Sequence, residues 1–238
     1  MTAGLMQIKS ISFLQFENEF IKLKTKEGNI MRLKSLVVAM AAVASLAPIA
    51  SQAQSTDNSN PWMVRVRATD LIWQNGQTNA VSTLNVKAEN KVIPEFDVSY
   101  FFTKNIATEL VLTYPQSIQI NAGSSKLGTI KALPPSLLLQ YHFTELGAFK
   151  PYVGAGINYT IFSSRSNLGN GTYSVASSST GFAGQVGADY MLDKNWGLNI
   201  DVKYITMATD VTVVSSGANA GKLTLNPWTP SVGVTYKF

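Results

Sequence analysis

The sequence predicts an all-β fold: an eight-stranded antiparallel up-and-down β-barrel that crosses a membrane. Three observations predict it. Apolar and polar residues alternate over segments of about ten residues, the connections alternate between short and long, and aromatic residues recur at both ends of the segments. A tilted strand of about ten residues is long enough to cross a hydrocarbon core. A water-soluble β-sandwich would share the alternation, but the three patterns together favour the barrel.

The first 61 residues are expected to lie outside the barrel. Residues 31–53 combine a basic start, an apolar stretch and a small-residue cleavage site, Ser51-Gln-Ala53, which is the pattern of a secretory signal peptide. Pro48 ends the apolar run before the roughly 20 residues that a membrane-spanning helix needs. We therefore expect an upstream extension over 1–30, a signal peptide over 31–53, a short periplasmic tether over 54–61 and the barrel over 62–238.

Alternation with a period of two marks eight strands in the remainder, because successive side chains on a strand point to opposite faces. The clearest stretch is 133–162, where Leu139 and Tyr141 share an apolar face and Gln140 and His142 share the opposite one. The predicted strands are 62–73, 92–102, 106–115, 134–143, 151–162, 181–192, 196–209 and 228–238.

The connections fall into two sets that alternate along the chain. The short ones are 103–105, 144–150 and 193–195, and the long ones are 74–91, 116–133, 163–180 and 210–227. Short periplasmic turns and long external loops are typical of outer-membrane barrels. Both ends of the barrel then lie on the short-turn side, which requires an even number of strands.

Aromatic residues are placed at both predicted membrane interfaces, where amphipathic rings are favoured. The periplasmic set is Trp62, Phe102, Phe143, Trp196 and Phe238, and the outer set is Trp73, Tyr114, Tyr159 and Trp228. The terminal Phe238 follows alternating apolar residues, so it also resembles the sorting signal that the barrel-assembly machinery reads.

Charged residues on the inward faces are expected to form a lumen plug. They are Arg65, Arg67, Glu95, Asp97, Glu109, Asp189, Asp201, Lys203 and Lys237. Most of them fall in the periplasmic half, where cations and carboxylates nearly balance. A set of ion pairs filling a narrow barrel is the simplest interpretation, and a proton- or ion-conducting path is the alternative.

The outer half of the lumen is predicted to be more apolar and to hold a ligand pocket. Its inward residues are Leu71, Ile93, Val111, Leu138, Ile205 and Met207. Simple core packing is the alternative, since side chains can fill an eight-stranded barrel. Gly154 and Gly156 on the inward face argue for spare room.

Prolines mark a possible lateral gap in the wall. Pro115 ends one predicted strand at the outer side, and Pro134 and Pro135 begin the next at the same height. Proline has no backbone N–H to donate to a strand ladder. These residues predict an interrupted strand pair beside the apolar pocket, or they only bracket the connection 116–133.

The sequence argues against a nucleic-acid-binding protein, a metal-binding protein and an enzyme. The formal charge of +5 owes much to residues before Gln54, and 13 Lys and Arg against 11 Asp and Glu remain, so nucleic acid is not an expected partner. The chain has no cysteine and no metal-ligand spacing. The only histidine, His142, lies six residues from Ser136 on one strand, roughly 20 Å away, so the two cannot form a catalytic pair. We expect no enzyme and no cofactor.

Four segments resemble the OmpW family of Gram-negative outer-membrane proteins: Leu133-Pro-Pro-Ser-Leu137, Pro151-Tyr-Val-Gly-Ala-Gly-Ile-Asn-Tyr-Thr160, Gly184-Gln-Val-Gly-Ala-Asp-Tyr190 and Tyr236-Lys-Phe238. The resemblance implies a narrow, partly apolar barrel in the outer membrane, linked to passage of small hydrophobic molecules. Lys203 departs from it, because members can carry an aromatic residue near this position. The alternative function is a structural or surface-interaction barrel with a closed lumen.

Overall fold

The computed structural model describes residues 60–78, 85–166 and 168–238. The expected extension, the signal peptide and residues 54–59 of the tether lie outside the described residues. Among the residues that are described, no helix is long and apolar enough to cross a membrane.

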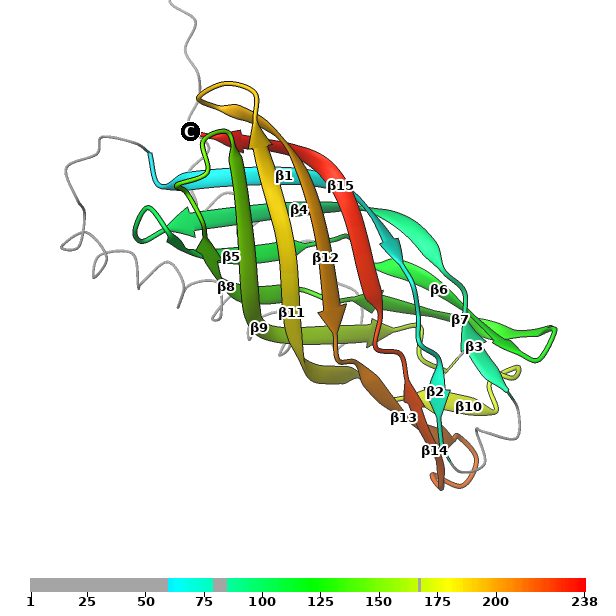
Figure 1. The fold of residues 1–238 in the computed structure, drawn as a ribbon. Helices are drawn as coiled ribbons and strands as arrows, with labels where there is room; N and C mark the ends of the chain where they lie inside the picture. The colour runs from blue at the N-terminus through cyan, green and yellow to red at the C-terminus, as the bar shows by residue number, and fades with distance from the viewer. Residues whose placement is uncertain (1–59, 79–84, 167) are drawn as a thin grey trace, which may run out of the picture. The chain divides into compact units, whose positions relative to one another are not determined.

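Eight antiparallel strands close into a ring, which confirms the predicted fold class (Figure 1). Each strand pairs with the next, and the last pairs with the first from Met63↔Lys237 to Thr69↔Ser231. In ring order the strands are β1 (Trp62–Leu71), β4 (Lys91–Phe101), β5 (Ile106–Leu112), β8 (Ser136–His142), β9 (Phe149–Ser163), β11 (Ser178–Met191), β12 (Trp196–Ile205) and β15 (Trp228–Lys237).

The barrel turns its apolar faces outward. On β8, Leu139 is 60% exposed while Leu138 is 1% exposed, and Gln140 is buried as well. The same alternation places Phe182 and Val186 of β11 on the outside and Gln185 on the inside. Because a soluble sheet buries its apolar face, this arrangement fits strands surrounded by lipid.

The short turns are closed by side chains that accept backbone hydrogen bonds. Asp193 Oδ1 accepts from the N–H groups of Asn195 (2.8 Å) and Trp196 (2.7 Å), and Thr103 Oγ1 accepts in the same way from Asn105 and Ile106. The bonds from Trp196 and then Asn195 stabilise the carboxylate and lower the pKa of Asp193. Asp and Thr favour such turns for this reason.

The long connections contain further strands that the sequence analysis did not predict. They are β2 (Gly76–Gln77), β3 (Val86–Ala88), β6 (Gln116–Ala122), β7 (Ser125–Leu133), β10 (Tyr173–Val175), β13 (Ala208–Val213) and β14 (Asn219–Thr224). The barrel sheet continues from β9 through β7 and β6 to β3, and a second sheet has the order β10-β13-β14-β2. The predicted strand 196–209 is divided, since β12 ends at Ile205 and β13 starts at Ala208.

Eight of the nine aromatic residues predicted for the two girdles are exposed or half-buried, as residues facing lipid would be. Trp62, Phe143, Trp196, Phe238, Tyr114, Tyr159 and Trp228 are exposed, and Phe102 is half-buried. The placement of Trp73 in the outer girdle is wrong. Trp73 shares the inward phase of Leu71, is buried, and donates its indole N–H to the Glu89 carbonyl (2.9 Å).

Candidate functional site

Arg65 of β1 contacts side chains of four other strands, β4, β5, β9 and β11, in the lower lumen, the part predicted to be periplasmic. Its guanidinium binds both oxygens of Asp189, at 3.1 and 2.7 Å, and donates to Glu109 at 2.6 Å. It also donates to Ser99 (3.2 Å) and lies over the Tyr152 ring, 4.8 Å from its centre. Two-point binding of a carboxylate fixes the geometry as well as the charge. Arg65 is therefore held on every side within the barrel.

Arg67, two residues farther along the same face, binds a second group of carboxylates. Its Nε donates to Asp97 at 2.7 Å and lies 3.1 Å from Glu95. Its Nη2 is 3.4 Å from Glu109, which is thus shared with Arg65. The side chains of all these residues are almost completely buried.

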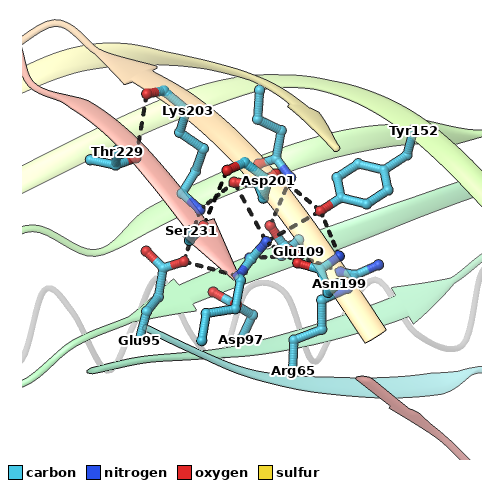
Figure 2. A network of polar contacts seen from close by, with 12 residues as sticks. Arg65, Glu95, Asp97, Glu109, Tyr152, Asn199, Asp201, Lys203, Thr229 and Ser231 are labelled. Carbon is cyan, nitrogen blue, oxygen red and sulfur yellow. Dashed lines mark hydrogen bonds and ion pairs between the residues drawn. The ribbon is translucent and has the colours of Figure 1, made fainter. Parts of the chain in front are cut away.

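Lys203 completes the network from β12 (Figure 2). Its ammonium is 2.8 Å from both Glu95 and Asp201. The Tyr152 hydroxyl donates to Asp201 at 3.0 Å and accepts from the Asn199 amide at 3.1 Å. The interacting side chains come from strands on opposite sides of the barrel. Together they extend across the lumen at this level.

The structure brings together eight of the nine charged residues predicted for the plug. The ninth, Lys237, is placed with its ammonium 4.9 Å from the centre of the Phe101 ring. Sequence reasoning missed polar members of the network such as Ser99, Tyr152, Asn199, Gln185 and Thr235. They could have been identified from the alternation along their strands, because each follows or precedes an outward-pointing apolar residue and must itself point inward.

The six residues predicted for the ligand pocket all lie in one buried apolar cluster. Leu71, Ile93, Val111, Leu138, Ile205 and Met207 share it with residues of the outer strands. Lys203 is the nearest cation along β12, two residues before Ile205. The lumen therefore changes from polar, mostly charged side chains to apolar ones along these strands.

A cavity of about 230 Å³ opens within the outer part of this cluster. It lies between the β3-β6-β7 sheet and the β10-β13-β14 strands, and none of the six predicted residues lines it. Its lining includes Val86, Ile120, Leu127, Leu168, Val211 and Leu223. Alternating apolar residues in the long connections, such as Ile118 and Ile120, were the signal that could have revealed these strands.

The two inward glycines of β9 do not create spare room, so that interpretation is wrong. A Cβ at Gly154 would meet side-chain atoms of Gln185 and Gln140 at 3.1 and 3.2 Å. A Cβ at Gly156 would collide with the backbone of Leu137 and Leu138. The glycines are needed because neighbouring strands approach closely at these positions.

Backbone pairing is interrupted where the prolines lie. The β5–β8 ladder ends at Val111↔Ser136, and the β6–β7 ladder starts at Gln116↔Ala132. The three predicted residues, Pro115, Pro134 and Pro135, lie between these two pairs. On the other side the chain is held to β9, because Tyr159 N–H donates to the Pro135 carbonyl at 3.0 Å.

A second interruption adjoins the first along β4. The β4–β5 ladder ends at Phe96↔Leu112. Within the described residues, the next backbone hydrogen bond between these two stretches of chain runs from the Glu89 N–H to the Gln119 carbonyl (3.1 Å). Pro94 lies in the interval and is exposed. Sequence reasoning missed Pro94, although it is the third residue of the predicted strand 92–102.

Ser136 and His142 lie at opposite ends of β8, as predicted. The His142 ring stacks on Tyr152 with 5.0 Å between ring centres, and its Nε2 is 2.9 Å from Gln140 Oε1. Ser136 Oγ instead accepts from the Asn158 amide at 3.0 Å. In the described part of the chain, no group of three or more His, Asp or Glu side chains could hold a metal ion.

Comparison with known proteins places these features in a family. The model of the OmpW family matches residues 60–238. An uncharacterized outer-membrane protein of Sinorhizobium fredii is 42% identical over 184 residues, covering 75% of this chain and 80% of its own. A Pseudomonas aeruginosa protein named for a dibenzothiophene metabolism operon is 27% identical, covering 75% of this chain and 89% of its own.

A solved structure shows the same architecture. The outer membrane protein OprG from Pseudomonas aeruginosa superposes with a TM-score of 0.63 at 27% identity. The superposition covers 74% of this chain and 95% of OprG.

Proposed function

Since this chain belongs to the OmpW family, and is an outer-membrane β-barrel of a Gram-negative bacterium, we propose that it admits small hydrophobic molecules. The molecules enter the apolar outer half and leave sideways into the bilayer. The relative named for a dibenzothiophene metabolism operon supports this substrate class, because dibenzothiophene is an apolar molecule.

The cavity carries the proposal. It is lined almost entirely by apolar side chains and is continuous with the apolar cluster of the outer lumen. A volume of about 230 Å³ suits a compact organic molecule. Burial of apolar surface supplies the free energy of binding without any charged group.

The charged network argues for a sideways exit. Arg65, Arg67 and Lys203 are held by carboxylates from several strands, so a straight path to the periplasm would require these ion pairs to separate. Breaking a buried ion pair is strongly unfavourable. The interrupted ladders around Pro115 offer a weaker part of the wall, beside the apolar cluster.

No catalytic step is part of the proposal. Ser136 and His142 point to different partners at opposite ends of one strand. The second candidate is the structural or surface-interaction barrel, and the filled lower lumen is the observation that favours it. The two candidates differ in whether occupation of the cavity affects uptake.

The test fills the cavity and measures uptake. Ala220 of β14 lines the cavity, whereas Ala218, in the connection just before this strand, is exposed. We expect Ala220→Leu to lower the uptake of an apolar solute several-fold, and Ala218→Leu to leave it unchanged. Cells that lack the gene give the background rate. Equal uptake by both variants and by cells without the gene would support the closed structural barrel.

A further inference from the structure

The outward face of the β3-β6-β7 sheet is polar, unlike the outward face of the barrel. Its inner face buries Val86, Ile118, Ile120 and Ile130. Its outer face carries Lys87, Ser117, Gln119, Asn121, Lys126, Thr129 and Lys131. Strands surrounded by hydrocarbon would carry apolar residues at these positions. This part of the wall therefore faces a polar environment.

The strand register gathers the lysines on one surface, which we name the lysine face: Lys87, Lys126 and Lys131. Asn121 pairs with Lys87 on one side and with Lys126 on the other. Neighbouring strands are about 4.8 Å apart, so these two lysines start roughly 10 Å from each other. Lys131 lies farther down β7 and pairs with Ser117 and Ser163.

The charge of this face is not neutralised by the described residues. Within the described part of the chain, none of the three lysines forms an ion pair, although other lysines do. The nearby carboxylate of Glu89 accepts hydrogen bonds from the amides of Gln119 and Asn121, both at 2.7 Å. The carboxylate keeps its charge, so the face presents three cations and one anion, a net charge of +2, to its surroundings.

The height of Lys131, the lysine of the face nearest the barrel, corresponds to the headgroup layer, and Lys126 lies five residues farther out on β7. Tyr159 of β9 is an exposed residue of the outer aromatic girdle, and Ser163, four residues farther out, pairs with Lys131. Four residues advance about 13 Å along a strand, or about 10 Å along the membrane normal at a tilt near 40°. That distance lies just beyond the hydrocarbon core.

We propose that the lysine face binds the phosphate groups of the phosphorylated glycolipid of the outer leaflet. Ammonium groups suit phosphate, which they bind as point charges. The face continues from β9 through the pair Lys131↔Ser163, so one glycolipid can place its acyl chains against the barrel and its phosphates against Lys131, with Lys87 and Lys126 farther out on the same face. This inference does not depend on the transport of hydrophobic molecules.

The test compares two triple variants of the purified full-length barrel in detergent. One carries Lys87→Gln, Lys126→Gln and Lys131→Gln. The matched control carries Lys104→Gln, Lys194→Gln and Lys222→Gln, three exposed lysines elsewhere. The folding of both is checked by heat-modifiable migration. The probes are bisphosphorylated lipid A, the same lipid without its phosphates, and inorganic phosphate.

Each basic residue near an anionic lipid surface strengthens binding about fivefold, so we expect the lysine-face variant to lose affinity for bisphosphorylated lipid A on the order of 100-fold. The control variant should bind like the unaltered protein. Equal affinity in both variants, or equal affinity for the phosphate-free lipid, overturns the proposal. If inorganic phosphate binds as tightly as the lipid, the face recognises a free anion, and the assignment to a glycolipid is wrong.

Discussion

At the scale of single residues, Arg67 links the largest number of buried carboxylates. Its guanidinium lies within 4.0 Å of Glu95, Asp97, Glu109 and Asp201. Isolated charges of this kind are very unfavourable away from water. The positive charge of Arg67 therefore makes burial of these carboxylates tolerable, and their negative charges make burial of Arg67 tolerable.

Replacing Arg67 should reveal this dependence. We expect Arg67→Met to lower the free energy of unfolding by about 3–5 kcal/mol, because buried carboxylates lose their partner. The measurement is urea unfolding of the barrel in lipid. Arg165→Met, at an exposed position, should cost much less.

A double variant separates charge from packing. In Arg67→Met with Asp97→Asn, one unpaired carboxylate is removed, so we expect part of the stability to return. If the single variant is as stable as the unaltered barrel, the network does not stabilise the fold.

At the scale of elements, the interrupted hairpin around Pro115 distinguishes one part of the wall. β5 and β8 pair below the prolines, and β6 and β7 pair above them. Proline cannot donate to a ladder, so it is tolerated only where pairing is already absent. The same connection continues into β6, which lines the cavity through Ile120.

Closing this interruption should block a lateral route. Ser136 belongs to the last β5–β8 pair, and Thr113 lies two residues beyond its partner Val111, so the two are diagonal neighbours within reach of a short thiol cross-linker. We expect cross-linked Thr113→Cys with Ser136→Cys to lose uptake of apolar solutes while the barrel stays folded.

The control pair lies in the intact part of the same ladder. Ala107 and Gln140 are directly opposite each other, so a cross-link between Ala107→Cys and Gln140→Cys should leave uptake unchanged. If uptake persists after cross-linking at Thr113 and Ser136, the proposed lateral exit between these strands is wrong.

At the scale of the whole molecule, the barrel exists only when its last strand meets its first. Phe238 N–H donates to the Trp62 carbonyl (3.1 Å) at the end of the β1–β15 ladder. Its ring packs edge-on against Tyr236, with 4.9 Å between ring centres. The C-terminal residue thus contributes both to closure and to the periplasmic girdle.

Phe238 is proposed to be the signal that the barrel-assembly machinery reads. We expect Phe238→Ala to reduce the amount of heat-modifiable barrel in outer membranes several-fold. Phe143→Ala removes an equally placed aromatic residue of the same girdle, which packs on Tyr141 in a similar way. If both variants assemble to the same level, Phe238 acts only as an interfacial aromatic residue.

The sequence by itself determined the ring of strands and the side to which each residue points. Leu139 faces outward and Gln140 inward because the side-chain period of a strand is two, whatever the rest of the fold does. The inward charges could be identified for the same reason, and the prolines because they lack a backbone N–H. Trp73 could also have been assigned correctly, since its phase matches that of Leu71.

Only the tertiary structure decided which inward groups meet and where space remains. Glu109 of β5 is shared by Arg65 and Arg67 of β1 because the two strands bring these side chains to one height, which depends on the stagger of the ring and not on spacing along the chain. The cavity depends on two outer sheets packing together, and Gly156 fits because backbones approach there. The period of two along a strand determines whether a side chain points inward or outward. The distance between two side chains across the barrel depends on how all eight strands are arranged.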